Sequence, residues 1–208
     1  MAKMNWSAFV KNKLIPELPE FSSRGRLVYL KGSSPILRGV YLEVSSFFPG
    51  SVYLQCLVLP LCVFHEYISF SIFNRIRNPI DGSTVFSSAD PELIIEAILS
   101  DGGPFLARFE GPERLLEELE TTYRELAKSD IYYAEMIACT YLYLQDFRKS
   151  RKWFHIMDNV IFKHRIYYPG MRGRVQLMLH ELSNRSHEEA YSRLEEWERV
   201  TRRNLQID

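Results

Sequence analysis

The hydrophobic residues of the first 88 positions recur mainly with a period of two, which is typical of β-strands. Within Ile36–Phe48, the apolar residues Val40, Leu42 and Val44 share one face of an extended chain. The Pro-Gly pair that follows predicts a hairpin at Phe48–Ser51. The expected strands are Arg26–Gly32, Ile36–Phe48, a strand that starts at Val52, and Glu66–Ile76. Four consecutive strands with short turns predict an antiparallel β-meander.

Helical spacing precedes this region and dominates after it. The apolar residues of Asn5–Leu14 cover one face of a short helix, which we expect to dock on the sheet. Asp90 as N-cap and Pro91 at the first helical position start another helix, with an expected end at Asp101–Pro104 and a linker at 105–109. The remaining expected helices are Pro112–Lys128, Ile131–Leu144, Phe147–Lys163, Gly170–Ser183 and His187–Asn204.

The pattern therefore predicts an α+β fold. Residues 1–88 are expected to be mainly β, an antiparallel meander with a packed helix. Residues 89–208 are expected to form an α-helical half of helical hairpins. Because no low-complexity linker separates the halves, we expect them to form one compact unit.

The stretch VYLQCLVLPLCVFHEYISF, from Val52 to Phe70, combines cysteines and a histidine with apolar residues. It is too short and too polar for a transmembrane helix, which needs about 20 apolar residues. In a strand, Cys56 and Cys62 lie about 20 Å apart, too far for a shared zinc ion or a disulfide unless Pro60 reverses the chain. His65 is expected to point to the opposite face from Cys62 unless Pro60 or a neighbour forms a bulge. We interpret the cysteines as buried structural residues and Pro60 as a strand break, bulge or edge.

The amino-acid composition argues against several classes of protein. The 26 basic side chains equal the 26 acidic ones, which argues against a dedicated nucleic-acid or anionic-membrane binder. Three cysteines do not form a secreted disulfide framework, and the N-terminal residues lack the apolar core of a signal peptide. We therefore expect a cytoplasmic protein with free thiols and no membrane segment.

Two resemblances concern architecture. The segment YYAEMIACTYLYLQDFRKSRKWFHIM, Tyr132–Met157, resembles one tetratricopeptide-type helical hairpin, with small residues at Ala138 and Ser150. Together with VYLQCLVLPLCVFHEYISFSIFNRI, DGGPFLARFEGPERLLEEL and the C-terminal EEWERVTRRNLQID, the order of features resembles uncharacterised bacterial proteins of the domain-of-unknown-function class. The resemblance implies no site residue; it implies a partner-binding role such as that of an immunity protein against a toxin.

Catalytic motifs of the common kinds are missing from the sequence. It has no phosphate-binding loop, no G-x-G-x-x-G, no H-E-x-x-H, no G-x-S-x-G and no C-x-x-C. His65-Glu66 lacks the second histidine of a zinc helix, and the other histidines are scattered. We therefore expect no catalytic residue, cofactor or metal, and favour a protein that is not an enzyme.

Charge is the most uneven feature. Acids outnumber bases eight to three in Glu110–Glu135, whereas bases outnumber acids eight to two in Asp146–Arg174. A candidate anion or nucleic-acid patch consists of Arg148, Lys149, Arg151, Lys152, Lys163, Arg165, Arg172 and Arg174. Trp153, Tyr167 and Tyr168 lie among them and either stack on bases or pack under lysine stems. The alternative is a solvated face neutralised by the acidic helix, which the zero net charge favours.

The preferred hypothesis is a non-enzymatic cytosolic interaction protein that binds a protein partner or self-associates. One alternative is a small-ligand binder or enzyme with a cleft between sheet and helices. The other is weak nucleic-acid binding through the basic patch.

Overall fold

The computed structural model describes residues 4–32, 34–66, 68–69, 72–164, 169–184 and 186–207. The strands are β1 (Phe21–Arg24), β2 (Leu27–Leu30), β3 (Ile36–Val44), β4 (Ser51–Pro60), β5 (Ile72–Arg75) and β6 (Phe86–Ser87). The helices before residue 110 are α1 (Trp6–Phe9), η1 (Val10–Leu14), η2 (Ile15–Glu17), α2 (Pro91–Ala97), η3 (Ile98–Gly102) and α3 (Gly103–Ala107). Those after it are α4 (Pro112–Thr122), α5 (Arg124–Ala127), α6 (Ile131–Tyr143), α7 (Phe147–His164), α8 (Pro169–Ser183) and α9 (His187–Leu205).

The sheet is antiparallel, with strand order β1-β2-β3-β4-β5, and β6 pairs with the start of β4. The α+β class and the N-terminal antiparallel sheet are thus confirmed. The short strands β1 and β6 were missed by the sequence pattern, because two to four residues are too few to show a period of two.

Residue contacts group the chain into two compact units. Unit 1 consists of residues 1–59, 70–109 and 206–208, and unit 2 of residues 60–69 and 110–205. The boundaries of these units differ from the expected division between residues 88 and 89. Helices α2, η3 and α3 belong with the sheet.

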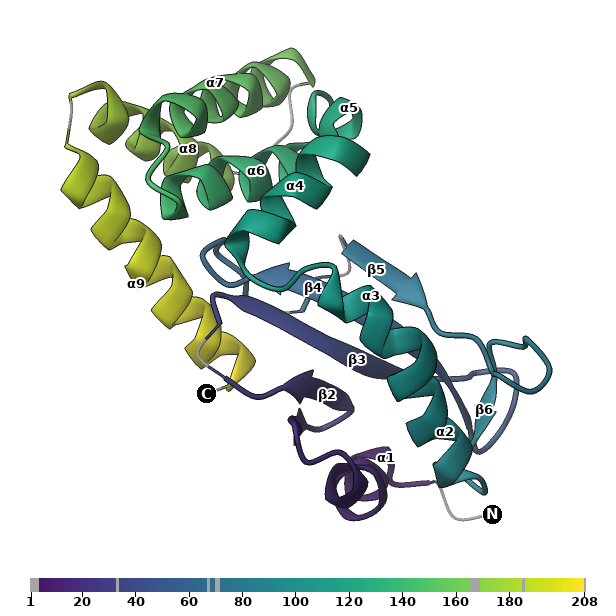
Figure 1. Cartoon of the computed structure of the whole chain (residues 1–208). Coiled ribbons are helices and arrows are strands. Elements are labelled where there is room, and N and C mark those ends of the chain that lie inside the picture. Colours follow the sequence, from purple (N-terminus) through teal and green to yellow (C-terminus); the bar gives the residue numbers. More distant parts are fainter. Residues whose placement is uncertain are drawn as a thin grey trace. The chain divides into compact units, whose positions relative to one another are not determined.

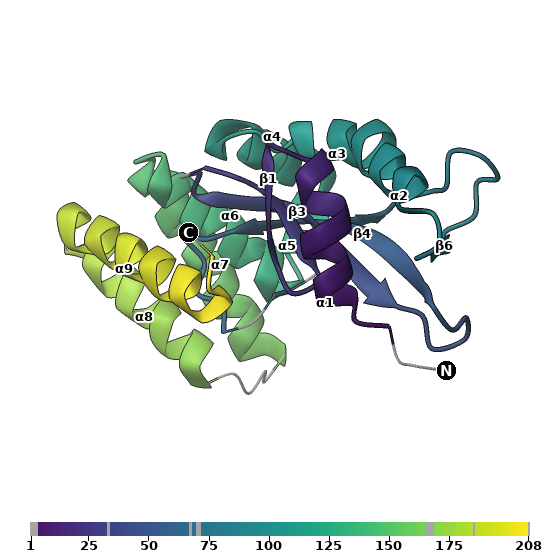
Figure 2. The same ribbon diagram turned by 90° about the horizontal axis from the view of Figure 1, so that it is seen from below.

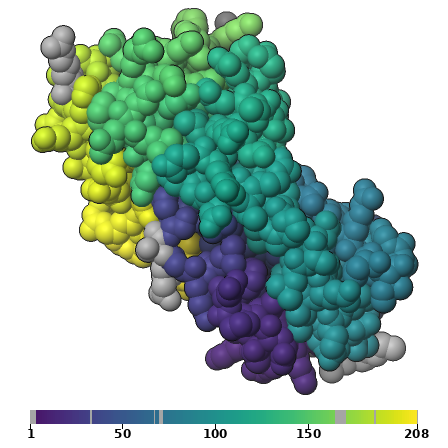
Figure 3. All heavy atoms as spheres, viewed as in Figure 1, coloured from purple at the N-terminus to yellow at the C-terminus, as the bar shows by residue number. Residues whose placement is uncertain are grey.

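In unit 1, α2 and α3 lie along one face of the sheet (Figures 1 and 2), and the space-filling view shows their side chains at the surface (Figure 3). The contact is close at Gly102, where an added Cβ would lie 3.3 Å from Cys56 Sγ and 3.0 Å from Ile76 Cδ1. Cys56 is fully buried there. Sheet and helix therefore touch directly at this point, without space for a ligand.

The second helix starts as expected and ends later than expected. The Asp90 carboxylate accepts a hydrogen bond from the Leu93 amide at 3.2 Å, which caps α2. The expected end at Asp101–Pro104 was wrong, because a π turn, η3, passes directly into α3. Pro104 lies directly after this π turn, in the first turn of α3.

Unit 2 is built around α6, which is buried along almost its whole length. Ala138 of α6 and Ser150 of α7 are small residues that let the two helices touch, and the Ser150 hydroxyl donates a hydrogen bond to the Ala138 carbonyl at 2.9 Å. Among the described residues, no helix is both long enough and apolar enough to cross a lipid bilayer.

The β4–β5 segment, residues 60–69, leaves the sheet and belongs to unit 2. Pro60 is the last residue of β4, and a turn follows in which the Val63 amide bonds the Pro60 carbonyl. The expected strand Glu66–Ile76 was therefore too long, because Glu66, Ile68 and Ser69 are not in a strand; the described pairing with β4 covers Ile72–Arg75. Tyr67, Phe70 and Ser71 lie outside the described residues.

Candidate functional site

Helix α7 presents two different faces. Its buried residues follow helical spacing and pack into unit 2; they are Ser150, Trp153, Phe154, Met157, Val160 and Ile161. Asp146 caps the N-terminus by accepting a hydrogen bond from the Lys149 amide at 3.1 Å. Lys and Arg side chains are excluded from the buried face, so they line up beside it.

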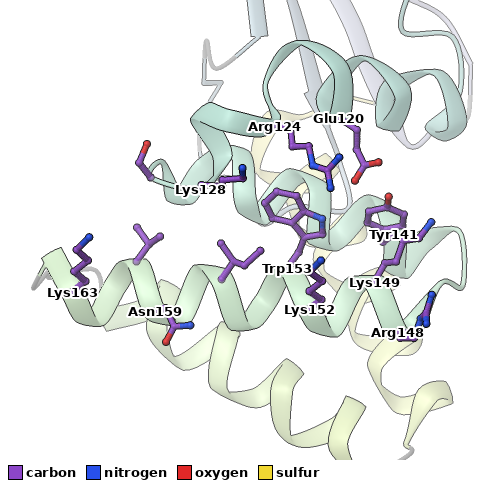
Figure 4. Close-up of a pocket in the computed structure, with 13 residues that line it drawn as sticks. Glu120, Arg124, Lys128, Tyr141, Arg148, Lys149, Lys152, Trp153, Asn159 and Lys163 are labelled. Atoms are coloured by element: carbon purple, nitrogen blue, oxygen red, sulfur yellow. The ribbon is translucent and has the colours of Figure 1, made fainter.

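A groove of about 830 Å³ runs beside α7 within unit 2. Helix α7 contributes four cations to its lining: Arg148, Lys149, Lys152 and Lys163. Figure 4 shows these along α7, with Glu120, Arg124 and Lys128 on the other side of the groove. Six cationic side chains thus face one carboxylate, that of Glu120.

Four of the six cations have no ionic partner. Across the part of the chain that the structure describes, no carboxylate lies within 4.0 Å of Arg124, Arg148, Lys152 or Lys163. No direct ion pair therefore has to be broken before these four side chains bind an anion.

The other two cations are held weakly. Lys128 Nζ lies 2.6 Å from a Glu125 carboxylate oxygen, and Lys149 Nζ lies 3.3 Å from Asp146 Oδ2. These pairs are largely exposed to solvent, which screens the attraction between the two charges. A stronger anionic ligand can therefore recruit both lysines.

Tyr141 and Glu120 form the polar corner of the groove. Lys149 Nζ lies 4.9 Å from the centre of the Tyr141 ring. Burial, followed by the hydrogen bond to Glu120, raises the pKa of Tyr141 above its ordinary value. The phenol therefore stays protonated and donates to the Glu120 carboxylate.

The structure brings together only part of the predicted patch. Arg148, Lys149, Lys152 and Lys163 line the groove, whereas the exposed side chains of Arg151 and Arg172 do not. Arg165 lies outside the described residues, as do Tyr167 and Tyr168. Trp153 is only 5% exposed, so it packs into the unit rather than offering an open ring face.

Arg174, the last member of the predicted patch, is bound to a buried carboxylate. Its Nε and Nη2 donate to Glu135 Oε1 at 3.2 and 3.0 Å. Its guanidinium lies 5.1 Å from the ring centre of Phe64 and 5.9 Å from that of Trp197. Burial raises the pKa of Glu135, and Arg174 opposes this shift. Arg174 thus compensates a buried charge.

Arg124 and Lys128 are the site residues that the sequence reading missed. They belong to the acidic stretch 110–135, where counting charges over the whole stretch concealed them. Their spacing of four residues on a helix is the signal that could have found them, because it places both on one face.

The cysteines are buried thiols. Burial raises the pKa of Cys56 and of Cys62 to about 12, so both stay protonated at neutral pH. Cys56 belongs to unit 1 and Cys62 to unit 2. Within the described residues, no three His, Cys, Asp or Glu side chains are arranged to hold a metal ion.

Comparison with protein families, curated proteins and solved structures finds no match for this chain. The groove must therefore be interpreted from its own chemistry.

Proposed function

We propose that this protein is a non-enzymatic binding protein that holds an acidic segment of a partner protein in the α7 groove. The observation that carries the proposal is the set of four cations without an ionic partner, Arg124, Arg148, Lys152 and Lys163, all lining one groove. An arrangement of like charges in a concave site attracts anions and speeds their association.

A protein partner fits the groove better than a nucleic acid. Binding of single strands depends on bases stacking against open aromatic faces. The aromatic lining residues, Trp153 and Tyr141, are 5% and 4% exposed, so neither has a ring face free for a base. Carboxylates of a peptide need no such platform.

The lining chemistry supports binding rather than catalysis. Among the described lining residues, the hydroxyl groups are those of Ser129 and Tyr141. Ser129 Oγ donates to the Leu126 carbonyl at 3.1 Å, and the Tyr141 phenol is held protonated. The Ser129 hydroxyl donates to a backbone carbonyl, which cannot take up its proton, and burial beside Glu120 disfavours the charged Tyr141 phenolate, so neither group is activated as a nucleophile.

A binding measurement with a fluorescein-labelled polyglutamate peptide tests the proposal. At low ionic strength we expect saturable binding that weakens as salt is added. Reversing two groove charges, in Lys152→Glu with Lys163→Glu, should weaken binding at least about tenfold. The matched control, Arg151→Glu with Arg172→Glu, changes net charge equally outside the groove and should retain affinity within about threefold.

Circular dichroism must first show that both double variants keep the wild-type helix content. Equal losses in the two variants would mean that peptide binding follows net charge and not the groove, and the proposal would fail. A single-stranded oligonucleotide could instead bind more tightly than polyglutamate and lose this binding in the groove variant. That result would mean that the groove binds a nucleic acid and not an acidic peptide.

A further inference from the structure

Helix α7 places cations at both ends of the groove. Lys152 lies in the first half of α7 and Lys163 in its last turn. Figure 4 shows Lys128 across the groove from the middle of α7, between Lys152 and Lys163. The apolar side chains of Ile156 and Val160 line the groove between them. A ligand that matches the whole groove therefore carries acidic groups at both ends and an apolar side chain in the middle.

The helix itself sets the distance between the two ends. Lys152 and Lys163 are eleven residues apart in sequence, which is about 16 Å along a helix axis. An extended peptide covers this distance in about five residues, whereas a ligand helix needs about eleven. The spacing of the acidic groups thus depends on the ligand's conformation.

Asn159 favours the extended conformation. Its exposed side-chain amide lines the groove and has no hydrogen-bond partner among the residues that the structure describes. An extended peptide offers backbone N–H and C=O groups to such an amide, whereas a helix satisfies these groups internally.

Building on the proposed function, we infer that the groove binds an extended peptide with two acidic clusters about five residues apart and an apolar side chain between them. Both cationic ends are then occupied by one ligand, and the second contact forms at the high effective concentration that the first one creates. A peptide with a single acidic block reaches only one end.

Three synthetic peptides of identical composition test the inference by fluorescence anisotropy at low ionic strength. Each contains two Glu pairs and one Leu; the pairs are contiguous, about five residues apart, or about eleven residues apart. We expect the peptide with the five-residue spacing to bind about tenfold more tightly than the other two. Lys163→Glu should strongly weaken the binding of this peptide, and it should weaken the binding of the contiguous peptide at most about twofold.

Ile156→Ser provides the matched test of the middle of the groove. It should weaken the binding of the peptide that contains Leu. The affinity for the same peptide with Leu replaced by Ser should stay unchanged. Equal affinity of all three peptides would overturn the inference but leave the proposed function standing, whereas no binding of any acidic peptide would overturn both. Tightest binding of the peptide with the eleven-residue spacing would show a helical ligand and overturn the extended one.

Discussion

At the scale of single residues, Gly39 is a position where the neighbouring strand leaves no space for a Cβ atom. Gly39 of β3 pairs with Tyr29 of β2. A Cβ at position 39 would lie 2.5 Å from the Val28 carbonyl oxygen and 3.0 Å from Tyr29 Cβ. Because backbone atoms cannot move aside like a flexible side chain, the sheet requires glycine here.

Gly39→Ala should therefore destabilise the protein by about 2 kcal/mol or more, the usual cost of overpacking. Gly173→Ala is the matched control: it lies on α8 with no atom within 4 Å of an added Cβ. Alanine favours helix over glycine, so this variant should gain up to about 1 kcal/mol. Urea unfolding measures both, and equal effects in the two variants would contradict the close contact at Gly39.

His65 is expected to make the stability of the protein depend on pH. Burial, and then the nearby positive charge of Arg174, lower the pKa of His65 from 6.5 to about 4. Between these values the unfolded chain binds a proton that the folded protein does not bind. Stability should thus fall as the pH drops from 6.5 to about 4, by up to about 3 kcal/mol, and this contribution should level off below pH 4.

Comparing unfolding of the wild type and of His65→Gln across this pH range isolates the histidine. The variant should lose less stability on acidification. Glu135 acts in the opposite direction, since its raised pKa means that the folded protein takes up a proton before the unfolded chain does. An unchanged pH slope in His65→Gln would show that the imidazole is not the group responsible.

At the scale of elements, the β4–β5 segment is held by the last helix. The Thr201 hydroxyl accepts a hydrogen bond from the His65 amide at 3.0 Å and donates one to the Val63 carbonyl at 3.1 Å. The Asn204 amide donates to the His65 carbonyl at 3.0 Å. One buried hydroxyl on α9 therefore satisfies two backbone groups of a segment that has left its sheet.

Thr201→Val keeps the shape of the side chain but leaves both backbone groups without this partner. We expect a loss of about 1–3 kcal/mol in the free energy of unfolding. Thr121→Val is the control, because the Thr121 hydroxyl bonds its own helix at an exposed position. Its effect should stay within about 0.5 kcal/mol, and a comparable loss in both variants would argue against a special role for Thr201.

Element types were predicted better than element limits. Periodicity identified the sheet and the long helices, because burial of one face acts over many residues. It failed at Glu66–Ile76, where the alternation of Ile68 with serines looked like a strand although α9 holds the preceding residues. Contacts of this kind join residues more than a hundred positions apart, and no local pattern contains them.

At the scale of the whole molecule, the chain carries a net charge of zero and still concentrates positive charge at one groove. The sequence indicated that cations gather in 146–174, and half of the predicted patch does line the groove. It could not separate Lys152 from Arg174, because a cation facing solvent and one facing a buried carboxylate look alike in sequence. It also could not add Arg124, whose place depends on how α5 packs.

The three hydrogen bonds to the β4–β5 segment can form only late in the synthesis of the chain. Their partners are separated by 136 to 139 residues, so the ribosome makes the segment long before it makes the helix that receives it. Until Thr201 and Asn204 have left the exit tunnel, the Val63 carbonyl and the two backbone groups of His65 lack these partners. The β4–β5 segment is therefore without these partners while more than a hundred further residues are synthesised, and a chaperone that shields the segment would act during this interval.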